Sequence, residues 1–382
     1  MASDVSSRRV SPWLVGSGVL VALGAVFGVV LLHRPGPPEA APVVRTIQPV
    51  STAELVSFVG NQTCAPCHPN EFRGHAESQH ARAMSRVEAA THGELFRQPS
   101  NVKDPTRGAV YRTGVEGGRC VLTATAEGRR AIAEAEWGFG SGKHGITYLG
   151  RQNGLDVELR LSYYPGPKRW AFSPGQQLNS KSGGLVMETG LNKAAETVEG
   201  CFVCHSTAIA KEKDRLLPET TIMGVGCESC HGPGKEHVAA MRRGDRTLHL
   251  QDLKSLSGQQ LSQQLCGQCH RSPLGDDLND PFNRGQLPRL QGLALAQSLC
   301  FTNSNGKLSC ITCHDPHDQK PQSRGSYNSK CMSCHSGTSV EQRACPIEPQ
   351  GDCVSCHMPA QPVGMPFNIK YANHWIKVWA GR

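Results

Sequence analysis

The pattern Cys-x-x-Cys-His occurs seven times in this chain of 382 residues, and it constrains the fold more than any other feature. The pattern is the signature of c-type haem attachment. On one helical turn the positions i, i+3 and i+4 share a face, so two thiols can hold the porphyrin edge while the imidazole binds the iron. The motifs therefore predict seven covalently bound haem c groups, each with one iron.

The motifs name the attachment residues directly. The predicted haem-bearing cysteines are Cys64, Cys67, Cys201, Cys204, Cys227, Cys230, Cys266, Cys269, Cys310, Cys313, Cys331, Cys334, Cys353 and Cys356. The predicted proximal iron ligands are His68, His205, His231, His270, His314, His335 and His357. Redox-active CxxC pairs and zinc sites are the alternatives, but the first occurs singly and the second does not require a histidine after each pair.

The remaining histidines are candidates for the opposite side of each iron. Of the 16 histidines in the chain, nine lie outside the motifs, and His33 adjoins the hydrophobic N-terminal run. Eight candidates for seven positions predict mainly bis-histidine ligation and low reduction potentials, since methionine would raise them. The favoured distal ligands are His80, His144, His237, His317 and His374. The weaker candidates are His75, His92 and His249, and a missing ligand would leave one iron open to a substrate or gas.

The charge of the chain gives little indication of a binding partner. The formal net charge is +8. Seven ferric haems with ionised propionates would contribute roughly −7, which brings the holoprotein close to neutral. Neither a phosphate-binding glycine loop nor a lysine run is present, so no nucleic-acid partner is expected.

The N-terminus predicts a membrane anchor. Residues Pro12 to Leu32 carry no charged side chain, and Arg8 and Arg9 precede them. This length spans a bilayer, and the arginines favour a cytoplasmic N-terminus. We expect an anchor over residues 1–33 and a Pro-rich tether over 34–57, with the haem domain in the periplasm. A cleaved signal peptide, which would leave a soluble periplasmic protein, is the alternative.

We expect the soluble part to be mainly α, with extensive loops around the haems and a small inserted antiparallel β element at residues 101–180. Alternating apolar residues predict strands at 120–125, 132–137 and 157–164. We expect helices at 69–91, 234–243, 255–270 and 289–299. The haem-binding regions are predicted at 58–245, with haems 1–3 and the β element, and at 246–382, with haems 4–7.

Three cysteines lie outside the motifs. Cys300 and Cys345 flank the last motif cluster, and a disulfide between them is reasonable in an oxidising compartment. Cys120 is then expected to be a buried thiol in a strand.

Several longer stretches resemble a known family. SxHAxAM after the first motif, GVGCESCHGPGxxH, LxCxTCHDPH and CVSCHMP are similar to bacterial multihaem cytochromes c related to the tetrahaem cytochrome of the hydroxylamine oxidoreductase pathway. The resemblance implies stacked and perpendicular haem pairs that pass electrons in the periplasm. It also supports His80, His144, His237 and His317 as distal ligands. The CxxCK motif that marks the catalytic haem of the related nitrite reductases does not occur.

Two functions fit these features. The first is an electron carrier, in which seven low-potential haems connect a membrane donor, expected to be quinol-linked, with a periplasmic acceptor. The alternative is a multihaem oxidoreductase that acts on a small nitrogen or sulfur compound at one five-coordinate haem. We favour the carrier because no acid–base cluster or lysine-ligated motif stands out.

Overall fold

The computed structural model describes residues 44–176, 186–271, 287–318, 323–336, 345–347 and 351–379. These residues belong to one compact unit that begins at Val44. The predicted anchor, including Pro12 to Leu32, lies outside the described residues. Within the ranges that are described, no helix is long and apolar enough to cross a membrane.

A nine-stranded antiparallel sheet forms the core of the β region. Its strand order is β10-β11-β7-β6-β5-β4-β3-β2, and β1 pairs with β5 beside this path. The strands are β1 (Met84–Arg86), β2 (Val102–Asp104), β3 (Ala109–Glu116), β4 (Arg119–Ala126), β5 (Arg129–Phe139), β6 (Thr147–Gln152), β7 (Leu155–Leu159), β10 (Val186–Met187) and β11 (Gly190–Asn192).

The local sequence explains how this sheet forms. Along β5, Ala133, Ala135 and Trp137 are buried while the residues between them are not, as expected for a strand with one face toward a core. Asn153 and Gly154 connect β6 to β7 with φ angles of 52° and 78°. A two-residue turn with positive φ at both positions matches the twist of a hairpin, which is why Asn-Gly is favoured there.

Helix α5 (Ala89–Arg97) closes the core of the sheet. Its Phe96 is fully buried and meets Tyr148 and Trp170 edge to face, with ring centroids 5.1 and 5.0 Å apart. Trp170 lies on β9 (Arg169–Phe172), which pairs with β8 (Leu161–Tyr164). Cys120 is 2 % exposed in β4, so the expected buried thiol is confirmed.

The expected fold class, mainly α, is wrong. Helix and strand are close to balanced, at about 34 % and 27 %. Strands lie at 102–172 as predicted, but the sheet extends beyond 101–180 through β1, β10 and β11. Two further hairpins lie outside it, β12 (Ser206–Glu212) with β13 (Arg215–Met223) and β14 (Ala360–Pro362) with β15 (Lys370–Ala372). The first five residues of β12 are all buried, and β14 and β15 have only three residues each, so none of them shows the period-two pattern that predicts a strand.

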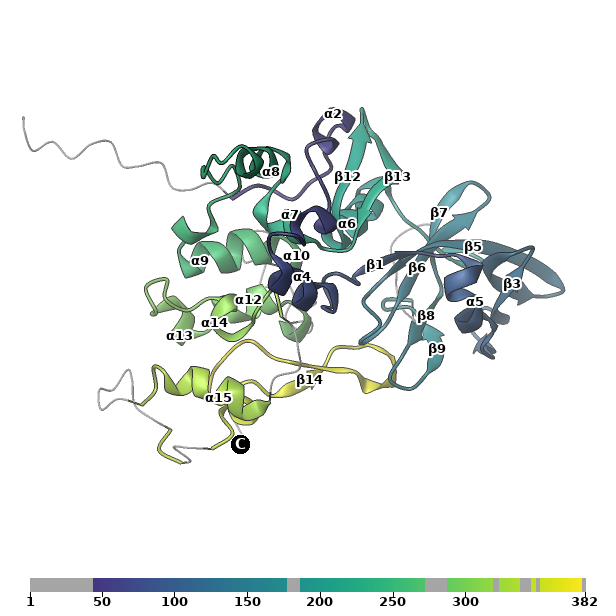
Figure 1. Ribbon diagram of the computed structural model, residues 1–382. Coiled ribbons are helices and arrows are strands. Elements are labelled where there is room, and N and C mark those ends of the chain that lie inside the picture. Colours follow the sequence, from purple (N-terminus) through teal and green to yellow (C-terminus); the bar gives the residue numbers. More distant parts are fainter. Residues whose placement is uncertain are drawn as a thin grey trace, which may run out of the picture. The chain divides into compact units, whose positions relative to one another are not determined.

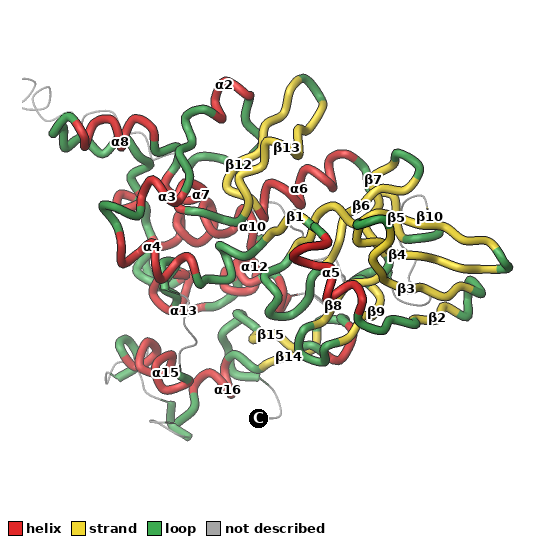
Figure 2. Tube along the Cα trace, turned by 45° about the vertical axis from the view of Figure 1, so that its right-hand side comes forward, coloured by secondary structure: helices red, strands yellow, loops and turns green. Residues whose placement is uncertain are grey.

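The predicted helices are present in part. Helix 69–91 ends at Ala76, because residues 84–86 pair with β5 instead of continuing the helix. Helix 234–243 is confirmed as α8, and the segments 255–270 and 289–299 are helical but interrupted. The helices α9, α12, α13 and α15 gather apart from the strands β3 to β6 (Figures 1 and 2).

The helical elements are short. They are α2 (Thr52–Leu55), α3 (Asn61–Cys64), α4 (Pro69–Ala76), α6 (Ala195–His205), α7 (Cys227–His231), α8 (Lys235–Arg242), η1 (Leu253–Ser255), α9 (Gly258–Gln260), the π-helix η2 (Leu261–Cys266), α10 (Gly267–His270), η3 (Leu287–Arg289), α12 (Gln291–Ala296), α13 (Leu299–Thr302), α14 (Cys310–Cys313), α15 (Arg324–Met332), α16 (Cys353–His357) and η4 (Pro366–Asn368).

Residues 44–57, the end of the predicted tether, contact the rest of the unit. Val44 is buried against Leu256, Leu261 and Leu265, and Val50 forms a parallel bridge with Ala210. The two predicted haem-binding regions contribute to the same unit, and the division between them at residue 245 stays a prediction.

Candidate haem-binding site

A short helical segment overlaps each Cys-x-x-Cys-His motif. The amide of His68 donates to the carbonyl of Cys64 at 2.9 Å, and the same bond joins His314 to Cys310 and His335 to Cys331. These are i to i+4 helical hydrogen bonds, so the two cysteines and the histidine of a motif share one face, as the spacing predicts.

Four motif histidines face a second histidine that belongs to another part of the chain. The ring centroids are 6.4 Å apart in His68–His237, 6.0 Å in His80–His270, 6.1 Å in His231–His317 and 6.2 Å in His314–His374. Two imidazoles on opposite sides of one metal ion, each with a metal–nitrogen distance of about 2.0–2.1 Å, place their centroids roughly 6.3 Å apart. The four pairs therefore fit axial ligation of haem iron on both faces.

Burial keeps these rings in the form that binds iron. Desolvation, with smaller contributions from His270 and His75, lowers the pKa of His80 to about 4. Desolvation likewise lowers the pKa of His374 to about 4, with His314 beside it. Both imidazoles are therefore neutral at pH 7, and a metal ligand must be deprotonated to bind.

Backbone carbonyls select the nitrogen that is free for iron. In four histidines, Nδ1 lies 2.8–3.1 Å from a backbone carbonyl oxygen. The pairs are His205 with Ala83, His237 with Leu248, His357 with Lys377, and His374 with Ala372. A carbonyl only accepts, so Nδ1 carries the proton and Nε2 is left with its lone pair. The same support by a second group orients histidine ligands in many metal sites.

His144 is placed differently from the other favoured distal ligands. Its ring lies against Tyr371, with centroids 4.5 Å apart, and within the described part of the chain no ring contact joins it to a motif histidine. His144 nevertheless lines the same cavity as His205, the histidine of the second motif. Its predicted role as a distal ligand stays a prediction.

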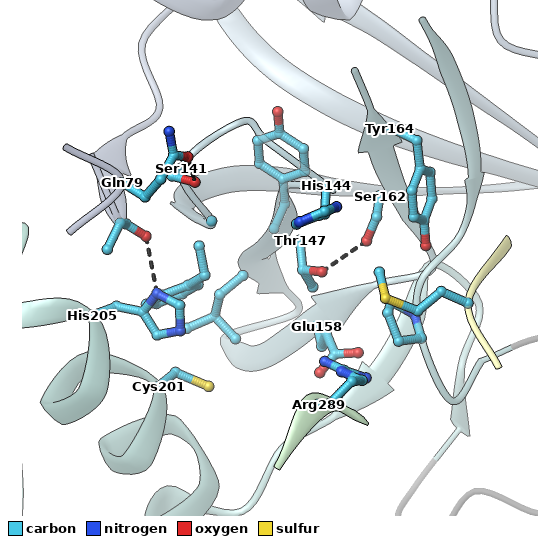
Figure 3. A pocket seen from close by; sticks show the side chains of 18 of the residues that line it. Gln79, Ser141, His144, Thr147, Glu158, Ser162, Tyr164, Cys201, His205 and Arg289 are labelled. Carbon is cyan, nitrogen blue, oxygen red and sulfur yellow. Dashed lines mark hydrogen bonds between the residues drawn. The ribbon is translucent and has the colours of Figure 1, made fainter. Parts of the chain in front are cut away.

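The cavity beside His205 has a volume of about 470 Å³. Cys201 and His205 form one wall, while Ser141, His144, Tyr164 and Arg289 contribute polar groups from the other sides (Figure 3). The space opens directly at the second motif, so it fits the haem that Cys201 and Cys204 would hold. It was not foreseen, because its lining comes from at least seven separate stretches of the chain.

The weaker distal candidates have other partners. His92 contacts the hydroxyls of Ser85 and Thr91, at 3.2 and 2.8 Å from its two ring nitrogens. His249 lies 3.5 Å from the Asp245 carboxylate. These polar contacts agree with the lower rank of His92 and His249 as candidates for distal iron ligands.

The expected disulfide between Cys300 and Cys345 is wrong, since both cysteines are free. Burial raises the pKa of the Cys300 thiol, and the nearest thiols that add to this effect are those of Cys313 and Cys334. Packing of α13 against the motif cluster therefore places Cys300 beside the fifth and sixth motifs.

A residue that the sequence reasoning missed ties two motifs together. Glu228, the second residue of the third motif, is 2 % exposed. Its carboxylate accepts hydrogen bonds from the amides of Val59 and Gly60, just before the first motif, and from Gly234. The signal was present in the motif as its one acidic x position, but only the fold shows its partners.

The helical Cys-x-x-Cys-His turns and their facing histidines are the arrangement expected for covalently bound haem c. The family model described as cytochrome c554 and c-prime matches residues 172–232, which include the second and third motifs. These observations agree with a multihaem cytochrome c. The link to hydroxylamine oxidoreductase stays a prediction.

Two further proteins are similar to this chain. The dissimilatory sulfite reductase MccA of Wolinella succinogenes is 27 % identical over 209 residues, which are 42 % of this chain and 27 % of that protein. The chain thus matches about a quarter of that relative's length. The crystal structure of the outer cell wall cytochrome OcwA aligns over 84 % of this chain and 80 % of that chain, with 15 % identity and a TM-score of 0.43.

Proposed function

We propose that this protein is a heptahaem cytochrome c that carries electrons one at a time between a membrane donor and a downstream acceptor. Haem supplies the redox-active iron, while the protein determines its ligands, spacing and surroundings. The observation that carries the proposal is the set of four histidine pairs with the spacing of bis-histidine ligation.

Paired histidines favour a carrier over a catalyst. An imidazole on each side of the iron leaves no position for a substrate, so electrons can move without a change of ligands. Histidine as both ligands also keeps the reduction potential lower than a methionine would. The seven motifs support seven haems, and the four pairs supply the sixth ligand for the first, third, fourth and fifth.

The proposal includes a location and partners. Haem attachment through Cys-x-x-Cys-His supports a site outside the cytoplasmic membrane, with a quinol-linked donor and a periplasmic acceptor. The hydrophobic run from Pro12 to Leu32 supports attachment to the membrane. Intact mass of the mature protein would show whether this run is retained.

Electron paramagnetic resonance and optical spectra of the ferric protein test the carrier. We expect seven haems by pyridine haemochrome and low-spin iron at the four paired sites. Far fewer haems, or high-spin iron at most sites, would contradict the proposal.

The cavity beside His205 supports a second candidate, an oxidoreductase that acts on a small nitrogen or sulfur compound. If His144 does not reach the iron, the face opposite His205 is open to a cavity that Arg289 and Tyr164 line. A guanidinium is suited to an oxyanion because it offers charge and paired donors. The similarity to a sulfite reductase agrees with this chemistry but covers only part of that enzyme.

The variant His144→Ala separates the two candidates. If His144 is the sixth ligand, the wild type gives a low-spin signal at the second haem and the variant loses it. If the site is open, the wild type already contains a high-spin iron that shifts with nitrite, sulfite or hydroxylamine, and His144→Ala leaves the spin state unchanged. Arg289→Ala should then weaken anion binding and leave the other haems unaltered.

A further inference from the structure

The fourth motif contacts other motifs on several sides. Cys201 and His205 of the second motif and His270 of the fourth motif line the same cavity. Helix α14, which begins at Cys310 of the fifth motif, packs against η2, which ends at Cys266. The fourth motif therefore adjoins the second motif on one side and the fifth on another.

The third motif reaches the fourth through apolar packing. Cys230 packs against the apolar cluster that includes Leu261 and Leu265, and both leucines lie on η2, the π-helix that ends at Cys266. The fourth motif thus has the second, third and fifth motifs as neighbours.

The contact with the fifth motif is built into the backbone. The amide of Cys310 donates to the buried hydroxyl of Ser262 at 3.1 Å, and the amide of Gly258 donates to the carbonyl of Gly306 at 2.8 Å. A Cβ atom at Gly258 would lie 2.4 Å from that carbonyl oxygen. A glycine at this position therefore permits the close approach.

The other described motifs continue the series. The amide of Cys227 in the third motif donates to the side chain of Asn61 on α3, the helix that ends at Cys64, and α3 packs against α7. At the other end α14 packs against α15, and α15 against α16. These contacts order the motifs as first, third, fourth, fifth, sixth and seventh, with the second joined at the fourth.

We propose that the fourth motif, through Cys266 and His270, is a three-way junction in the electron path, and that the second motif with its cavity is a side branch reached through it. The proposal rests on the proposed redox function and adds the order of its sites. An electron that arrives at the first or the seventh motif has to pass the fourth before it reaches the cavity beside His205.

A pair of ligand variants tests the junction. His80→Ala removes the ring that faces His270, so the fourth iron becomes high-spin and speeds the magnetic relaxation of the irons beside it. His237→Ala is the matched control, because it opens the first iron, whose described neighbour is the third. Power-saturation resonance spectra should show three perturbed neighbours in His80→Ala and one in His237→Ala. Two or fewer in His80→Ala would overturn the junction.

Gly258→Ala gives an independent readout with every ligand in place. We expect it to weaken the coupling between the fourth and fifth irons and to leave that between the fourth and second unchanged. Equal loss at both contacts, or at neither, would overturn the assignment.

Haem content is measured for every protein. If His80→Ala retains fewer than seven haems, the variant His80→Met replaces it. A methionine ligand raises the reduction potential of the fourth haem, which shifts the potentials of the neighbouring haems. Potentiometry then counts these neighbours. A wild type with far fewer than seven haems would contradict the proposed function, whereas a fully loaded protein with too few coupled neighbours contradicts only the junction.

Discussion

The amide of Gly60 donates a hydrogen bond to the Glu228 carboxylate at 2.8 Å, and this contact joins the turn before the first motif to the helix of the third. Val59 and Gly234 donate to the same carboxylate at 2.9 and 2.7 Å. A buried carboxylate with three amide donors is a strong local constraint, because its removal leaves buried amides without an acceptor.

Glu228→Ala should therefore destabilise the protein. It leaves three amides without their acceptor in a buried place, at a cost of at least about 3 kcal/mol in the free energy of unfolding. Chemical denaturation of the holoprotein measures this change. Glu236→Ala, an exposed glutamate on α8, is the control and should change stability little. Equal stability of the two variants would show that the Glu228 contacts contribute nothing.

Gly74→Ala should remove the sixth ligand of the third haem. A Cβ atom at Gly74 would lie 2.5 Å from the backbone oxygen of His317, so α4 and His317 have to separate. His317 would then leave its place opposite His231, and about one iron in seven should become high-spin. Gly114→Ala, where a Cβ meets nothing within 4 Å, is the control. A fully low-spin spectrum for Gly74→Ala would rule out this displacement.

Ser298 holds the segment of His374, the proposed distal ligand of the fifth haem. Its buried hydroxyl donates to the carbonyl of His374 at 3.0 Å and accepts from the amide of Ile376 at 2.8 Å. Ser298→Ala should shift part of the fifth haem to high spin, whereas His374→Ala should shift all of it. Resonance spectra measure both fractions. Ser304→Ala is the control, because within the described residues the Ser304 hydroxyl makes no hydrogen bond with His374, and it should leave the spectrum unchanged. An equal shift to high spin in Ser304→Ala would argue that Ser298 does not position His374.

Asp104 should make the stability of the β region depend on acid. Burial on its own raises the pKa of this carboxyl, but hydrogen bonds from Thr106 and Arg160 and the charge of Arg160 outweigh it, so the pKa lies below the ordinary value of 3.8. The ion pair with Arg160, at 2.6 Å, is fully formed above that value and its contribution is lost as the pH falls through the lowered pKa.

Asp104→Asn tests this dependence. The substitution leaves the Arg160 charge buried without its partner, which should cost about 3–5 kcal/mol. Urea unfolding at neutral pH and in acid should show a smaller acid-induced loss in the variant than in the wild type, because the variant has no carboxyl to protonate. Asp156→Asn, at a more exposed ion pair, serves as the comparison. If Asp104→Asn loses as much unfolding free energy in acid as the wild type does, groups other than Asp104 cause the acid-induced loss.

The sequence was sufficient for the local part of the site and insufficient for the part that depends on long-range contacts. The motif residues follow from spacing within five positions. His80, His237, His317 and His374 could be selected by counting and by family resemblance, but their partners could not, since each pair joins distant segments. The fold class was wrong because strands such as β12 and β13 do not alternate between buried and exposed residues along their length, so a period-two pattern misses them.

The third motif has a consequence for how the protein is made. His231 is synthesised long before His317, the ring that faces it, and the same is true of His314 and His374. A chain that emerges from its N-terminus exposes these motifs while half of each ligand set does not yet exist. In the proposed cytochrome, thioether bonds would therefore retain each cofactor during biosynthesis until its second histidine has been made.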